Sequence, residues 1–152
     1  MKQVSCGAVI FRENGDRKFL LLLKGNYFEF VKGYIEEGEE EKETVKREIQ
    51  EETEINDIEF IEGFREIYTF DYNLKGKSIF REIILYLVKT TMEDVKISYE
   101  HDSYKWLTFD EAIKIIKFKN MKEILTKAND FLNGPLRKFI TWKLEKLKLE
   151  IT

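Results

Sequence analysis

Three glutamates near the middle of the chain, Glu48, Glu51 and Glu52, have the types and spacing for metal chemistry. On a helix of about 3.6 residues per turn, they fall within an arc of roughly 100°. Like charges at these spacings repel by about 0.2–0.5 kcal/mol per pair. A hard cation such as Mg²⁺ removes that repulsion, and it favours carboxylate oxygens together with substrate phosphates. The spacing therefore predicts a divalent-cation site, and a solvated, glutamate-rich helix face is the alternative.

The segment around these glutamates has the pattern of an amphipathic helix that follows a loop. From residue 39 to 52 there is neither Gly nor Pro, and apolar residues stand four apart, which predicts one helix. In the loop before it, Gly33 and Gly38 let the backbone approach closely, so that carbonyl oxygens can join a cation site. Ten Glu against three basic residues give the stretch 36–54 a charge of −7, and the rest of the chain therefore carries +4. An acidic patch on a mildly basic body suits a polyphosphate substrate.

Length and composition indicate one globular domain. The chain has 152 residues, of which 43% are hydrophobic, enough to bury a core but too few for two ordinary domains. No apolar run approaches the roughly 18 residues of a membrane helix, and the first residues lack a signal-peptide pattern. The single cysteine cannot form an internal disulfide, so we expect a cytoplasmic protein.

Strand patterns dominate the first two thirds of the chain and helical patterns the last third. Strands are expected at residues 4–11, 19–23, 58–72, 78–89 and 104–107, with a short extended piece at 28–30 before a loop around Gly33. Helices are expected at 39–52, 109–118 and 120–132, followed by a helix stop at 133–135. The expected architecture is an α/β fold with a mixed β-sheet sandwiched between helices.

The glutamate segment resembles the sequence box of the Nudix hydrolase family. That box reads Gly, five residues, Glu, seven residues, Arg-Glu, an aliphatic residue, any residue, Glu-Glu, any residue, Gly and an aliphatic residue. The matching residues are Gly33, Glu39, Arg47, Glu48, Ile49, Glu51, Glu52 and Ile55. One position departs, because Glu54 stands where the family has its last glycine. That glycine is expected to end the helix at positive φ, where another residue costs about 1 kcal/mol.

The resemblance implies a Nudix fold and a role for each residue of the box. Glu48, Glu51 and Glu52, with the backbone at Gly33, are implied ligands of Mg²⁺, for which Mn²⁺ could substitute. Glu39 and Arg47 look like an ion pair that locks the loop to the helix. The implied reaction is in-line attack of a cation-activated water on phosphorus, after which a carboxylate accepts the proton. The candidates for that carboxylate are Glu48, Glu52 and Glu100.

Other segments are similar to the diadenosine tetraphosphate hydrolase branch of this family. They are residues 5–11, the entry to the box at 30–36, the segment 100–107 and residues 118–132. This similarity implies asymmetric hydrolysis of diadenosine tetraphosphate to ATP and AMP. Two alternatives stay open. One is another Nudix activity, on a nucleoside triphosphate, ADP-ribose or the 5′-triphosphate end of RNA. The other is a catalytically silent nucleotide-binding module.

Four residues outside the box are further candidates, and each also has a simpler interpretation. Glu100 is a candidate metal ligand or water-activating base, or else an exposed loop acid. His101, the only histidine, is a candidate contact to a phosphate or leaving group, or else an ordinary loop residue. Lys32 is expected to meet phosphate, or else to be solvated. Tyr86 is a candidate for stacking on adenine, although strand aromatics more often belong to the core.

The end of the chain extends beyond the family resemblance. We expect a Nudix domain at residues 1–135 and a C-terminal amphipathic extension at 136–152 with a charge of +3. Apolar residues at helical spacing, among them Leu136, Phe139 and Ile140, favour docking on the same domain or on a dimer partner. The expected partners are a nucleotide polyphosphate and no membrane. Nucleic acid is not expected except as an RNA 5′ end, and the chain is expected to be a monomer or a homodimer.

Overall fold

The computed structural model is built around one mixed β-sheet; it describes residues 2–151, apart from the side chains at 136, 140, 141 and 151. The strands are β1 (Lys2–Arg12), β2 (Lys18–Lys24), β3 (Tyr27–Glu29), β4 (Val31–Tyr34), β5 (Glu59–Leu74), β6 (Lys77–Lys89) and β7 (Ser103–Leu107). The helices are α1 (Glu41–Thr53), α2 (Phe109–Ile115), α3 (Lys119–Asn133) and α4 (Pro135–Ile151). The expected α/β fold is confirmed.

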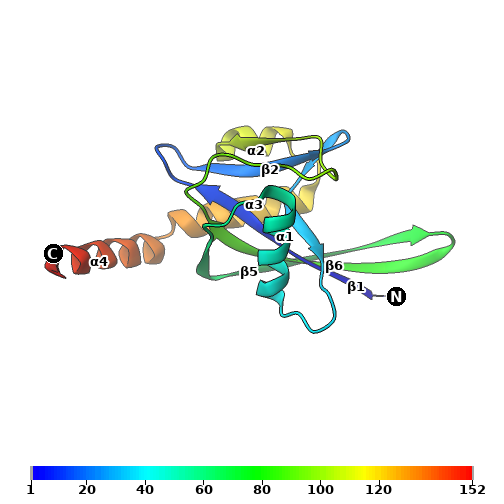
Figure 1. The fold of residues 1–152 in the computed structure, drawn as a ribbon, viewed down its shortest axis with the longest axis horizontal. Helices are drawn as coiled ribbons and strands as arrows, with labels where there is room; N and C mark the ends of the chain where they lie inside the picture. Colours follow the sequence, from blue (N-terminus) through cyan, green and yellow to red (C-terminus); the bar gives the residue numbers. More distant parts are fainter. Residues whose placement is uncertain (1, 152) are drawn as a thin grey trace.

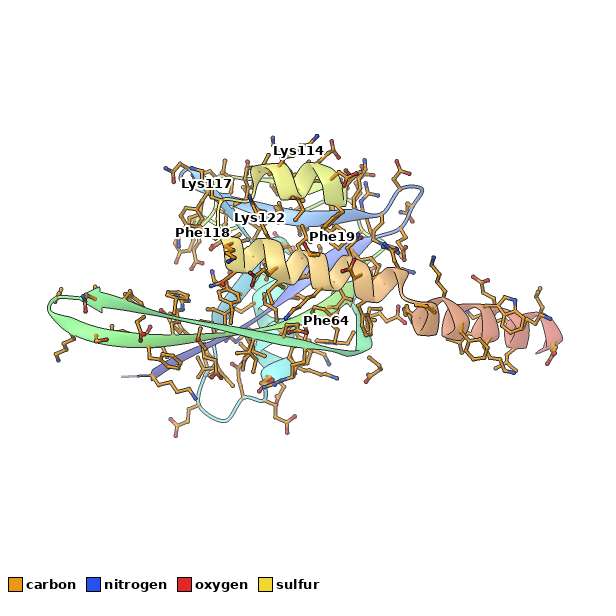
Figure 2. All side chains as sticks on the ribbon, turned by 180° about the vertical axis from the view of Figure 1, so that it is seen from behind. Phe19, Phe64, Lys114, Lys117, Phe118 and Lys122 are labelled. Atoms are coloured by element: carbon orange, nitrogen blue, oxygen red, sulfur yellow. The ribbon has the colours of Figure 1, made fainter. Side chains whose placement is uncertain are left out.

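The sheet has the order β3-β2-β1-β6-β5, with β4 also paired to β1 and β7 to β2. β1 and β6 are parallel, with Cys6 opposite Ile84, and the other pairs are antiparallel. Helix α1 covers one face of the sheet, and α2 and α3 cover the other (Figure 1). Figure 2 shows the α3 side, where Phe19 and Phe64 belong to the core beneath the helices. The sheet is therefore sandwiched between helices, as expected.

Side chains alternate between two cores along the central strands. In β1, Val9 and Phe11 face α2 and α3, whereas Cys6, Ala8 and Ile10 face α1. This period of two follows from the pleat, which sends successive side chains to opposite faces. Because both faces are buried, the strand reads as a continuous apolar run and not as an alternating one. The same alternation decides below which aromatic residues reach the site.

Strand β4 is the element that the sequence did not indicate, because a loop was expected around Gly33. Its four residues pair with β1, and Cys6 lies opposite Gly33. A Cβ at Gly7 would overlap the carbonyl oxygen of Val31 and the side chain of Lys32, so this close pairing requires glycine at that position. A short strand containing polar and glycine residues has little local signal. Its partner strand β1, 23 to 29 residues away along the chain, determines its conformation.

Helix α4 leads away from the body as an arm, at the end of the molecule opposite the β5–β6 turn (Figure 1). Phe139, Trp142 and Leu144 are each at least half exposed, at 56%, 50% and 51%. The structure thus does not show these residues packed on their own domain, and docking on a dimer partner stays a prediction. The apolar side chains expected at 136 and 140 lie outside the described ones. No helix within residues 2–151 is long and apolar enough to cross a membrane.

Removing residues 135–152 should leave the domain folded, because both cores are built from the sheet and from α1, α2 and α3. We expect the far-UV spectrum to lose only the helical signal of α4, and the melting temperature to stay within a few degrees of that of the full chain. If α4 docks on a second copy, light scattering should give a dimer for the full chain and a monomer for the truncated one. A full chain that is monomeric at every concentration would contradict the dimer prediction.

Candidate active site

Helix α1 presents two of its glutamates to the protein and not to solvent. Val45 and Ile49 are fully buried in the core on this face of the sheet. Glu48 and Glu52 lie three residues after each of them, on the same stripe of the helix, and are only 8% and 4% exposed. The side chain of Glu51 is 56% exposed. The solvated-face alternative is therefore wrong for Glu48 and Glu52, because a solvated face would leave them in water.

The helix ends at Glu54, the position at which the box departs from the family pattern. Glu54 adopts the left-handed conformation, with φ 57° and ψ 19°, and its N–H donates to the carbonyl of Gln50. The backbone thus has the conformation that the family glycine would take without strain. The missing glycine leaves α1 intact but costs about 1 kcal/mol at its end.

Replacing Glu54 by Gly is therefore expected to stabilise the protein by about 0.5–1 kcal/mol, which is about 2–3 °C for a domain of this size. Thermal unfolding in the absence of metal measures the change. Glu54→Ala is the matched control, because it removes the same charge but keeps a Cβ. If alanine stabilises as much as glycine, repulsion between glutamates and not the backbone explains the gain.

Arg47 ties α1 to the loop that precedes it. Its Nε donates to Glu39 Oε2 at 2.7 Å and its Nη2 to Glu39 Oε1 at 3.0 Å. Nη2 also donates to the carbonyl of Tyr34 at 3.0 Å, and Thr44 Oγ1 donates to Glu39 Oε1 at 2.8 Å. The hydrogen bonds from Arg47, and then that from the Glu36 N–H, lower the pKa of Glu39 to about 2. A bidentate ion pair of this kind fixes the orientation of both side chains and keeps Glu39 ionised. It is the ion pair that the resemblance implied.

Glu48 and Gly33 depend on each other sterically. Glu48 Oε1 accepts a hydrogen bond from Arg47 Nη1 at 2.8 Å. Its carboxyl lies so close to Gly33 in β4 that a Cβ there would overlap the Glu48 Cδ and both of its oxygens. Gly33 is not in the left-handed region, so its backbone conformation does not require glycine. The lack of space for a Cβ does. Burial raises the pKa of Glu48.

Glu52 is a buried carboxylate with one oxygen that has no partner among the described residues. Its Oε2 has no hydrogen-bond partner and is inaccessible to solvent. Burial first, and then the charges of Glu48 and Glu29, raise the pKa of Glu52 to about 9. A buried carboxylate of this kind is unfavourable unless something neutralises it. Its environment therefore favours either a proton or a cation.

These carboxylates fit a divalent cation in their chemistry. Glu52 supplies a buried oxygen without a partner, Glu48 supplies a second carboxylate next to it, and Gly33 brings a backbone close to Glu48. Oxygen donors of this kind suit Mg²⁺ or Mn²⁺. Within residues 2–151, no three acidic, histidine or cysteine side chains already converge closely enough to hold an ion by themselves. The partly exposed Glu51 instead accepts a hydrogen bond from Arg47 Nη1 at 3.3 Å.

The structure places Lys32, His101 and Glu100 beside this pair of carboxylates. Glu29 of β3 accepts a hydrogen bond from Lys32 Nζ at 2.8 Å, and its other oxygen lies 3.0 Å from His101 Nε2. Burial alone would raise the pKa of Glu29, but these two partners outweigh it and hold the pKa at about 2. Glu100 is exposed in the turn before β7, and its charge acts on Glu52. All three predicted residues thus lie near the carboxylates of α1.

An aromatic cavity of about 440 Å³ opens on the α3 side of the sheet. Its lining residues are Tyr27, Glu29, Phe30, Lys32, Tyr68, Phe70, Arg81, Leu85, Phe118, Asn120 and Met121. The rings of Tyr27 and Phe118 meet edge to face, with centroids 5.5 Å apart. Figure 2 shows Phe118 at the start of α3, with Lys117 and Lys122 near it. Glu29 and Lys32 belong both to this cavity and to the carboxylate site, so the two adjoin.

The structure places Tyr86, the candidate for stacking on adenine, on the other face of the sheet from the cavity. Its hydroxyl donates to Glu41 Oε1 at 2.6 Å, and its ring packs edge to face on Phe60. The neighbouring residue Leu85 lines the cavity instead. Along a strand, a shift of one residue reverses the face. Tyr86 therefore stabilises the contact of β6 with α1.

Sequence reasoning missed the aromatic residues that line the cavity. Tyr27, Tyr68 and Phe118 come from β3, β5 and the residue before α3, and no common motif connects them. Alternation along β5 could have placed Tyr68 and Phe70 on one face. It could not have shown which face meets α3, because that depends on long-range pairing.

The NUDIX domain family profile matches residues 1–128. This chain therefore belongs to the Nudix family, whose hydrolases use divalent metal ions.

Its relatives include hydrolases of dinucleoside polyphosphates. The chain is 36% identical over 142 residues to the asymmetrical bis(5′-nucleosyl)-tetraphosphatase of Sus scrofa, covering 84% of this chain and 94% of the relative. The Caenorhabditis elegans enzyme of that name is 32% identical over 137 residues, covering 86% and 96%. The crystal structure of a C. elegans Ap4A hydrolase binary complex has a TM-score of 0.72 at 31% identity, covering 87% of this chain and 98% of that one.

Proposed function

We propose that this protein hydrolyses diadenosine tetraphosphate asymmetrically to ATP and AMP, with Mg²⁺ as its cofactor. The observation that supports this most is the junction of two features. Glu48 and Glu52 are buried carboxylates whose environment favours a cation, and an aromatic cavity lies next to them. Glu29 and Lys32 line this cavity and also lie beside the carboxylates. Such a junction suits a ligand with a polyphosphate at one end and a base at the other. The names of the relatives support a dinucleoside tetraphosphate as the substrate, and the name of the C. elegans Ap4A hydrolase supports adenine as its base.

The carboxylates of α1 are proposed to bind the cations. Glu48, Glu51 and Glu52 would hold them together with the carbonyl of Gly33. Bound divalent ions neutralise the phosphate chain and make a bound water a nucleophile at neutral pH. The carboxylate that accepts the proton of that water is proposed to be Glu48, Glu52 or Glu100, each of which lies at this site. Arg47 contributes by fixing α1 to its loop through Glu39.

The cavity is proposed to bind one nucleoside of the substrate. Its volume of about 440 Å³ lies within the usual range for small-molecule sites. The rings of Tyr68 and Phe118 line it, and aromatic faces of this kind can stack on a base. Lys32 and Arg81 add positive charge to the lining, which attracts phosphate. This arrangement orients the phosphate chain toward the carboxylates.

Chromatography of reaction products tests the proposal. The purified protein is incubated with diadenosine tetraphosphate, nucleoside triphosphates, ADP-ribose and 5′-triphosphate RNA, with Mg²⁺, with Mn²⁺ or with EDTA. We expect ATP and AMP in equal amounts from the first substrate with Mg²⁺, the same products with Mn²⁺, and no products with EDTA. Water labelled with ¹⁸O identifies the phosphorus that is attacked. ADP as the only product, or no product at any pH with any metal, would contradict the proposal.

A further inference from the structure

Glu29 has each carboxylate oxygen engaged by a different residue of the site. Oε2 accepts from Lys32 Nζ at 2.8 Å, and Oε1 lies 3.0 Å from His101 Nε2. The side chains of all three are largely buried, at 11% exposed for Glu29, 19% for Lys32 and 2% for His101. Hydrogen bonds of ionised groups in such surroundings are short and directional. The three side chains therefore form one hydrogen-bonded unit.

Each partner of Glu29 is attached to a different part of the site. Lys32 precedes Gly33 in β4 and lines the aromatic cavity. His101 directly follows Glu100 in the turn before β7. Nδ1 of His101 is buried and has no hydrogen-bond partner within the described chain, so its ring is held through Nε2 alone. Glu29 is thus the hydrogen-bonding anchor of this histidine.

We infer that Glu29 is a positioning residue for the hydrolysis proposed above, which orients Lys32 with one oxygen and the turn bearing Glu100 with the other. This inference rests on the proposed function. Glu29 lies between the cavity and the carboxylates of α1, so a change there alters both the placement of the phosphate chain and that of Glu100. A misplacement of about 1 Å in such a site can lower a rate by about 100-fold. The sequence motif of the family does not include this position.

Glu29→Gln tests the inference, because glutamine keeps the size but offers one accepting oxygen in place of two. We expect kcat to fall at least about 10-fold and KM to rise, since misplacement affects both chemistry and phosphate binding. Glu29→Asp should also lower kcat, because the shorter side chain cannot reach both partners. Glu66→Gln is the control, since it also removes a carboxylate from an ion pair, with Lys127 at 3.3 Å, away from the cavity lining.

A double-mutant cycle separates positioning from general stabilisation. His101→Gln should lower kcat because it releases the turn that bears Glu100. In the Glu29→Gln background that turn is already released, so His101→Gln should lower kcat little further. Independent structural effects would instead multiply. A Glu29→Gln variant that melts earlier, but whose folded fraction retains the wild-type kcat and KM, would overturn the inference.

Imidazole NMR gives a readout that needs no substrate. The protein contains one histidine, so a long-range ¹H–¹⁵N spectrum reports His101 alone. We expect the Nε2 resonance to show a hydrogen-bonded nitrogen in the wild type and in Glu66→Gln, and to shift in Glu29→Gln. If the ring resonances shift but neither the wild type nor any variant hydrolyses the dinucleotide, the proposed function fails, while the hydrogen bond between Glu29 and His101 is supported. Ring resonances that are unchanged by Glu29→Gln would refute the anchoring itself.

Discussion

Replacing Glu48 by Gln is expected to lower kcat by about 10³-fold, within the range for loss of a catalytic carboxylate, while nucleotide binding changes little. Glutamine has nearly the same shape, so it fits the space that Gly33 leaves and still accepts a hydrogen bond from Arg47. It removes a buried negative charge that raises the pKa of the neighbouring Glu52. The metal-free variant should therefore melt no earlier than the wild type. Steady-state kinetics, nucleotide titration and thermal unfolding in EDTA measure the three quantities.

Glu37→Gln is the control for this variant. Glu37 lies in the loop before α1 and is exposed, so the same change of charge should leave kcat unaltered. A Glu48→Gln protein with more than a tenth of the wild-type activity would contradict a catalytic or ligand role. If the wild type and the variant bind nucleotide equally and neither hydrolyses any substrate, the protein is a binding module instead.

Replacing Gly33 by Ala should destabilise the protein by about 1–3 kcal/mol, as overpacking does, and should lower kcat by about 100-fold or more. The new Cβ would overlap the Glu48 carboxyl, so β4 or that carboxyl must move. Because φ at Gly33 is not in the left-handed region, the expected loss of stability comes from this overlap and not from backbone strain. Denaturant unfolding and steady-state kinetics measure both effects.

A double-mutant cycle with Glu48→Ala identifies the origin of this effect. Removing the carboxyl makes room for the Cβ, so Gly33→Ala should cost little stability in the Glu48→Ala background. Activity should stay low in both, because the carboxylate is absent. If Gly33→Ala destabilises the two backgrounds equally, the overlap with Glu48 does not explain the glycine.

Features set by local sequence could be predicted, and α1 is the clearest case. The absence of Gly and Pro from residues 39–52, the apolar spacing and the box placed Glu48 and Glu52 on a helix correctly. The ion pair of Glu39 with Arg47 also followed from the box. The burial of the two glutamates could not be seen in the sequence, because it depends on β4 and β1 packing against the helix.

Features set by contacts between distant residues were missed. Glu29 reads as a polar residue in a short extended piece, and only the fold brings it to His101, which is 72 residues away. Tyr86 lies on the α1 face and its neighbour Leu85 lines the cavity, because side chains alternate along β6 and the sequence does not say which face meets α3. Helix α2 ends at Ile115, earlier than expected, because the chain turns extended at Ile116. In each case long-range packing decided the outcome.

The central claim is that buried carboxylates of α1 bind divalent cations against a polyphosphate. Electron paramagnetic resonance of Mn²⁺ tests it directly, with and without a non-hydrolysable dinucleoside tetraphosphate, in the wild type, Glu52→Gln and Glu37→Gln. We expect the wild type and Glu37→Gln to bind Mn²⁺, more tightly when the analogue is present, and Glu52→Gln to lose at least about 10-fold in affinity. Equal affinity for Mn²⁺ in all three proteins would contradict the claim.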